Sequence, residues 1–152
     1  MAQQTAIYNN FAAELLRANV DLESDTIKIA LITDSYTLDE DGHTHFDDIT
    51  NEATGAGYTA GGITLTNITV TVDNTDDKAY ISADSPEWDS VTFDTAVRGA
   101  IIYKDTGTAS TSSLIMEIAF NADQDPQDVD FVINFDPDGV FDITVPNPVS
   151  PL

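Results

Sequence analysis

The residues with the clearest capacity for chemistry lie in the segment TLDEDGHTHFDD, residues 37–48. Alternate residues of an extended chain point the same way, so His43 and His45 would present both imidazoles to one side. With Asp47 or Asp48 beside them, the two imidazoles could bind zinc. No third ligand can be assigned, however, and the alternative is a pair of solvated loop histidines.

Carboxylate oxygens, the ligands that calcium prefers, are more abundant in the same segment. If Gly42 takes the sixth position of an EF-hand loop, then Asp39, Asp41 and Asp48 take the third, fifth and twelfth. The first position falls to Thr37 and no second helix follows, which excludes an EF-hand. The sequence predicts instead an Asp-rich turn in which Asp39, Asp41 and Asp48 could hold Ca²⁺ or another cation, and it indicates no other cofactor.

No motif typical of catalysis is present, since the sequence lacks a GxSxG elbow, a Walker loop and an HExxH motif. The segment GAGYTAGG, residues 55–62, is followed by a Thr-rich strand pattern, whereas a phosphate-binding loop leads into a helix. Asp84 and Glu87 could flank a glycosidic bond, but among 27 acidic residues some pair will always lie at a suggestive spacing. We therefore expect no catalytic residue and no enzymatic activity.

The charge balance is extreme, with 27 Asp and Glu residues against 5 Lys and Arg residues and a net charge of −22 on 152 residues. A surface of this sign repels nucleic acids and anionic lipid headgroups, so neither is expected as a partner. The acids are spread through the predicted loops rather than gathered in a tail. They form either the ordinary solvated surface of a soluble protein or an adaptation to high salt, which screens charge repulsion.

Composition also limits the setting in which the protein acts. The chain has no cysteine, so disulfides and thiolate metal sites are excluded. The N-terminal residues lack the cationic start and apolar run of a secretory signal, and no stretch approaches the ~20 apolar residues that span a bilayer. We expect a soluble protein whose stability comes from packing, assembly or bound cations.

Apolar periodicity predicts the elements that must position these residues. A single amphipathic helix is expected over residues 5–18 and a strand near residues 27–32. A Thr-rich alternation over residues 63–72 shifts phase at Asn67, which indicates a bulge or a break. The glycines of GAGYTAGG predict a sharp connection between closely passing backbones, and residues 37–51 are expected to form a surface loop. Further strands are expected at residues 79–83, 88–93, 98–104, 113–120, 129–135 and 140–145.

Strands at intervals of roughly 8–15 residues, separated by turn-forming residues, favour a mainly β fold. This spacing leaves an antiparallel sandwich or barrel open, and of these we expect an antiparallel β-sandwich, jelly-roll-like, with one N-terminal α-helix. Residues 1–145 should form one domain and the Pro-rich residues 146–152 an extended C-terminal arm. Arg98 and Lys104 should pair with acids on neighbouring strands or subunits. Aromatic residues on the predicted strands should fill the core, with a sugar-binding platform as the alternative: Trp88, Phe93, Tyr103, Phe120, Phe131, Phe135 and Phe141.

Four stretches have a distinctive order along the chain: YNNFAAELLRANVDLESDTIKIALITDSY, DDITNEATGAGYTAGG, EWDSVTFDTAVRGAIIYKDTG and SLIMEIAF. In this order they resemble a family of small virion proteins of tailed viruses of bacteria and archaea, of the head decoration or cement type. Together they cover most of the chain. The chain departs from the family in its few basic residues and in its final segment VPNPVSPL.

The resemblance implies a non-enzymatic β-sandwich that decorates and stabilises the capsid surface of the virion and is assembled in the host cytoplasm. It also implies a homo-oligomer, a trimer, whose other partner is the major capsid protein. The strong acidity points to a virus of a high-salt host. The alternative is a glycan- or receptor-binding spike or turret, or a tail-associated virion protein.

Overall fold

Three long strands rich in Ile, Val and Leu form the middle of the fold. These strands are β2 (Ile27–Thr33), β8 (Val97–Lys104) and β9 (Leu114–Gln124). In the computed structural model, which describes residues 5–144, β8 pairs antiparallel with β2 on one side and with β9 on the other. The short strands β1 (Ala6–Ile7) and β4 (Ile63–Thr64) complete a five-stranded sheet of order β1-β9-β8-β2-β4.

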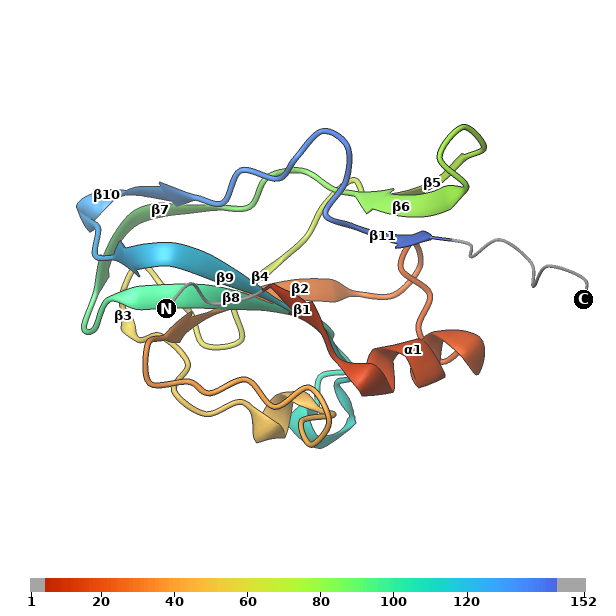
Figure 1. Ribbon diagram of the computed structural model, residues 1–152. Coiled ribbons are helices and arrows are strands. Elements are labelled where there is room, and N and C mark those ends of the chain that lie inside the picture. Colours follow the sequence, from red (N-terminus) through yellow and green to blue (C-terminus); the bar gives the residue numbers. More distant parts are fainter. Residues whose placement is uncertain (1–4, 145–152) are drawn as a thin grey trace, which may run out of the picture.

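Two three-stranded sheets form a second layer over one face of this sheet (Figure 1). One has the order β10-β7-β3, with strands β3 (Gly55–Ala56), β7 (Glu87–Phe93) and β10 (Gln127–Val132). The other has the order β11-β6-β5, with strands β5 (Thr69–Asp73), β6 (Lys78–Ser82) and β11 (Phe141–Thr144). Pairing in all three sheets is antiparallel. The predicted fold class is confirmed: the protein is mainly β and β-sandwich-like, with a helix near its N-terminus.

The main hydrophobic core lies between the two layers. It joins apolar side chains of the central strands to those of β6 and β7, among them Ile29, Ile102, Ile115, Ile81 and Val91. Trp88 and Phe93 are buried in this core, and Tyr103 is buried on the other face of the sheet. The remaining aromatic residues expected in the core pack half-buried against it: Phe120, Phe131, Phe135 and Phe141. Their expected role in the core is therefore confirmed.

Loops, rather than strands, cover the opposite face of the five-stranded sheet (Figure 1). They contain the short 3-10 helices η1 (Phe46–Asp48) and η2 (Ala109–Thr111). Phe46 of η1 stacks on Tyr103 of β8, with ring centroids 4.1 Å apart, and Tyr36 is buried beside them in a second, smaller core. The surface loop expected at residues 37–51 is confirmed, since all of these residues are exposed or half-buried, but the loop also covers an apolar face of the sheet. Because β2 is apolar on both faces, the loop must bury the face that the second layer leaves open.

Helix α1 (Asn9–Leu16) is shorter than the predicted range 5–18. Ala6–Ile7 pair with β9 as strand β1, and the backbone N–H of Tyr8 still bonds to β9 at 3.1 Å, so the chain is extended until residue 8. At the other end, Ala18 has a φ of 57° and stops the helix. The amphipathic pattern correctly predicted a helix here. Ala6 and Ile7, at the start of the predicted range, form a strand instead because the edge of β9 is within reach.

The break expected at Asn67 is confirmed. β4 ends at Thr64 in the five-stranded sheet, β5 begins at Thr69 in the second layer, and Asn67 between them has a φ of 52°. This change of layer explains the phase shift in the Thr-rich alternation. The predicted arm, residues 146–152, lies outside the described residues, and so does the predicted domain end at residue 145.

Candidate functional site

The three sequence-predicted cation ligands lie in the loop that covers the sheet, but the structure does not bring them together. Asp39 accepts a hydrogen bond from the backbone N–H of Gly42 at 2.8 Å. Asp41 accepts one from the side-chain amide of Asn9, at the start of α1. Asp48 has a separate role at η1. Each of the three carboxylates is therefore used in a different local contact. A cation shared between them stays a prediction.

Asp48 caps the turn that contains both histidines. Its carboxylate accepts the backbone N–H groups of Thr44 at 2.7 Å and His45 at 3.1 Å. The bond from Thr44 is the main cause that lowers the pKa of Asp48 below its ordinary value. The Nδ1 atom of His45 lies 2.9 Å from the Thr44 hydroxyl, and that of His43 lies 2.8 Å from the Tyr36 hydroxyl. These bonds fix the shape of the loop, and zinc binding by the histidines stays a prediction.

A buried polar cluster lies beneath this loop. The hydroxyl groups of Tyr8 and Tyr36 are 2.8 Å apart, and Tyr36 continues the chain of hydrogen bonds to His43. Glu117 of β9 lies on the same face of the sheet, is only 3% exposed, and its Oε2 atom has no hydrogen-bond partner among the described residues. Burial, and secondarily the negative charge of Glu40, raises the pKa of Glu117 to about 7.

This cluster is enclosed by the sheet and by the loop that covers it. A carboxyl group that titrates near neutral pH could transfer protons, but a substrate cannot reach a side chain as enclosed as Glu117. Burial also raises the pKa of Tyr36 to about 12, and the pKa of Tyr8 further, so both hydroxyls stay protonated. Sequence reasoning did not single out Glu117. Its signal is a lone acid inside the apolar run LIMEIAF.

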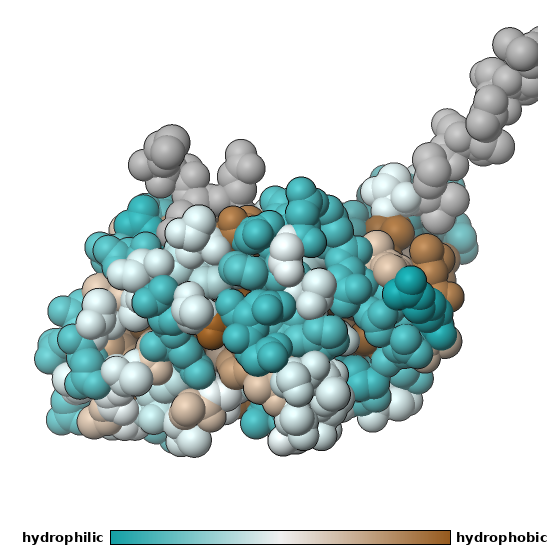
Figure 2. All heavy atoms as spheres, turned by 90° about the horizontal axis from the view of Figure 1, so that it is seen from below, coloured by the Kyte–Doolittle hydropathy of each residue, from teal (hydrophilic) through white to brown (hydrophobic). Residues whose placement is uncertain are grey.

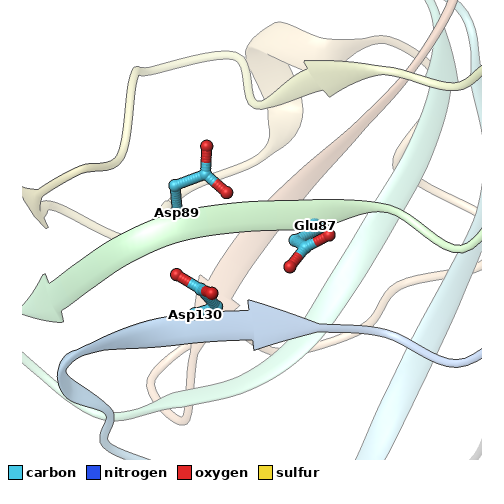
Figure 3. A group of neighbouring side chains, drawn as sticks. All are labelled: Glu87, Asp89 and Asp130. Atoms are coloured by element: carbon cyan, nitrogen blue, oxygen red, sulfur yellow. The ribbon is translucent and has the colours of Figure 1, made fainter.

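An acidic cluster lies on the outer face of the second layer, where β7 pairs with β10. Glu87 and Asp89 of β7 and Asp130 of β10 each place one carboxylate oxygen within 4.8 Å of the others (Figure 3). Asp130 also accepts the backbone N–H of Ser90 at 2.9 Å. All three side chains are exposed. Half of the signal is visible in the sequence, as the alternation of Glu87 and Asp89, but the approach of Asp130 depends on the β7–β10 register.

Asp84, whose spacing from Glu87 in the sequence we set aside as chance, lies outside this cluster. It accepts hydrogen bonds from Thr66 at 3.0 Å and Asn67 at 2.6 Å. These bonds hold the chain where it crosses from β4 to β5. The three clustered carboxylates offer the hard oxygen ligands that Ca²⁺ accepts, and at their spacing they repel one another without a cation.

All five basic side chains are already paired within the molecule. Arg98 bonds to Asp123 on the neighbouring strand β9 at 2.8 Å, as expected, whereas Lys104 bonds at 2.9 Å to Asp25, which lies in the turn before β2. The other pairs are Arg17 with Glu14, Lys28 with Asp105 and Lys78 with Asp142. All 27 acids lie within residues 5–144, so 27 minus 5 leaves 22 acids without a basic partner among the described residues. The excess charge is therefore a property of the whole surface.

The melting temperature should rise with salt because these 22 acids repel one another in the folded state. From dilute buffer to molar KCl we expect a rise in melting temperature of roughly 5–10 °C. This corresponds to about 2.5 kcal/mol of relieved repulsion, because each kcal/mol shifts the melting temperature of a chain of this size by roughly 2–4 °C. Calorimetry across a KCl series measures it, and glucose at equal osmolality serves as the control. A melting temperature that stays level or falls in KCl would contradict the assignment of repulsion.

None of the helices within residues 5–144 is both long and apolar enough to cross a bilayer. The site thus consists of a loop-covered polar cluster, an acidic cluster on β7 and β10, and a surface dominated by carboxylates. Comparison with known proteins gives no relative for this arrangement. No protein family model, no curated protein sequence and no solved structure matches the chain.

Proposed function

We propose that this protein is a non-enzymatic structural component of a tailed virus, which binds the major capsid protein and stabilises the capsid from its outer surface. The observation that supports this most is the order of the four stretches that resemble decoration or cement proteins. In the fold these stretches contain α1 and β2, then β3, then β7 and β8, and finally most of β9. The resemblance therefore covers all three central strands of the five-stranded sheet.

The matching stretches supply a scaffold. They contribute Ile29, Ile102 and Ile115 to the main core and Tyr36 and Tyr103 to the smaller one. A protein that clamps a shell needs a stable body and contact surfaces, and it needs no reaction centre. We propose a non-enzymatic role because the four stretches that resemble the decoration proteins contribute residues to both cores.

The acidic surface fits a particle exposed to concentrated cations. With 22 acids lacking a basic partner within residues 5–144, close packing of copies on a lattice would be opposed by repulsion in dilute solution. At molar salt the screening length falls to roughly 3 Å, so neighbouring copies can approach. We include in the proposal a high-salt host and cations, Ca²⁺ among them, between subunits.

Purified virions of the encoding virus test the proposal. In the salt of the host medium the protein should sediment with DNA-filled heads, at a copy number fixed by the capsid lattice. Washing in low salt should release it while the major capsid protein remains assembled, because repulsion is then unscreened. Recovery of the protein with isolated tails, or at a few copies per particle, would contradict capsid decoration and favour the tail or spike alternative.

A further inference from the structure

An apolar groove runs between α1 and β11 at one end of the molecule. Two hollows, of about 440 and about 300 Å³, share Leu15 and Ile143 in their walls and together form what we call the α1–β11 groove. The smaller hollow is lined only by apolar residues: Ile7, Phe11, Ala12, Leu15, Leu16 and Ile143. The larger one extends past Tyr80 and Phe141 towards Val70 of β5.

The groove contains three of the six exposed large apolar side chains among residues 5–144. Leu16 is 89% exposed, Ile143 47% and Val70 45%. Figure 2 shows apolar residues gathered at the end of the molecule that carries α1, while hydrophilic residues dominate the rest of that face. Large exposed apolar surfaces of soluble proteins usually mark an interaction site, and the partner of this one must bring apolar groups without adding negative charge.

The chain itself contains a segment of this chemistry. Residues 145–152, VPNPVSPL, carry no charged side chain, whereas the 27 acids and 5 basic residues all precede them. The segment follows directly after β11, whose Ile143 lines both hollows. Two valines and a leucine supply apolar groups, and three prolines favour the extended form that docks into apolar, aromatic-lined grooves without backbone pairing.

The direction of β11 favours the groove of another molecule. β11 and α1 are adjacent, with Phe11 and Phe141 in contact, and the β11 arrow points towards the end of the molecule that carries α1 (Figure 1). Pro146 and Pro148 restrict the residues before them to extended conformations, which opposes an immediate reversal of the chain into its own groove. Eight residues at roughly 3.1 Å each give a reach of about 25 Å, enough to lie along a neighbouring groove.

We propose that the α1–β11 groove of one molecule is the docking site for residues 145–152 of a second copy of this chain. Each copy then gives one segment and receives one, so a reciprocal dimer or a small closed ring satisfies every groove. Because the segment has no charged side chain, two strongly acidic molecules can meet there without adding side-chain carboxylates at the contact. This inference concerns the chain's own assembly and does not depend on what the assembled protein binds.

The absence of native cysteine permits a direct test by disulfide trapping. Leu16→Cys and Val149→Cys are made as separate full-length variants, the first labelled with ¹⁵N, and mixed in molar KCl under mild oxidation. We expect a covalent dimer that joins position 16 of the labelled chain to position 149 of the unlabelled one, identified by mass spectrometry. The matched control is Val129→Cys mixed with Val149→Cys, because Val129 is also exposed, at 51%, but lies on β10 outside the groove. The expected yield for the Leu16 pair is at least tenfold above this control.

Two outcomes would overturn the proposal. One is a yield of the 16–149 linkage no higher than the control. The other is rapid closure within single chains of a Leu16→Cys/Val149→Cys double variant at high dilution, which would place the segment in its own groove. As a second measurement, light scattering in molar KCl should give an oligomer for the full chain and a monomer for a variant lacking residues 145–152. An equal number of subunits in the two proteins would also contradict the exchange of segments.

Discussion

Replacing Gly62 by alanine should destabilise the protein by roughly 3–5 kcal/mol, a large share of the ~5–15 kcal/mol that stabilises a typical domain. Gly62 has a φ of 71°, and a β-carbon there would lie 2.7 Å from the Cα of Ala30 and closer still to the carbonyl oxygen of Ile29. Both obstacles are backbone atoms of the central strand β2. They cannot move without breaking the pairing of β2 with β4 and β8.

The neighbouring contacts make the cost larger. The Gly61 carbonyl accepts the Tyr103 hydroxyl at 2.7 Å, and the Gly61 N–H donates to Glu52 at 2.5 Å. A displaced segment would leave these partly buried groups without partners.

Gly107→Ala is the matched control for Gly62→Ala. Gly107 has a similar φ of 82°, but a β-carbon there would meet nothing within 4 Å. It should therefore cost only the backbone strain, about 1 kcal/mol. Urea unfolding of both variants measures the difference, and equal losses of stability would show that β2 and the glycine connection are not packed as described.

Glu117→Gln should stabilise the protein at pH 8 by about 2 kcal/mol and leave it nearly unchanged at pH 4.5. Burial raises the pKa of Glu117 from its ordinary value of 4.5 to about 7. The folded state therefore favours the protonated form of Glu117. The stability of the protein is full below pH 4.5, falls as the pH rises from 4.5 through 7, and then levels off. At 1.36 kcal/mol per pKa unit the loss approaches about 3 kcal/mol, of which the variant recovers most, because its amide is uncharged but still lacks a partner.

Chemical denaturation of both proteins from pH 4.5 to pH 8.5 at constant molar KCl measures this effect. Asp138→Asn is the control, since it removes one negative charge from an exposed turn and leaves the buried cluster intact. The gain of Glu117→Gln should grow between pH 4.5 and pH 7 and then level off, whereas that of the control should stay small throughout. A gain that is equal at both ends of the range, or a loss at pH 8, would contradict a charged and buried Glu117.

The strands could be predicted from the sequence because their signals are local. Short apolar runs such as residues 98–104 and the turn residues between strands placed β6 to β11 within a few residues of their observed bounds. The break at Asn67 and the close approach at Gly62 also follow from local patterns, a phase shift and a glycine pair. These features depend on the chain near each residue, so a single sequence contains them.

The features that were missed all depend on contacts between distant segments. Helix α1 begins late because Ala6–Ile7 find the edge of β9, more than a hundred residues away. The acidic cluster needs the register that sets Asp130 beside Glu87, and the buried state of Glu117 needs the loop that covers its face. Asp39, Asp41 and Asp48 match a spacing in sequence, but the loop turns each carboxylate to a separate partner.

The most direct test of the proposed capsid role is a cryo-electron microscopy map of the intact virion in the salt of its host medium. The account predicts density for this β-sandwich-like fold on the outer face of the major capsid protein, repeated with the symmetry of the lattice. Such a map would also show whether α1 and β11 face a neighbouring copy. Density for the fold only at the tail or at spikes, or none at all on the particle, would contradict the account.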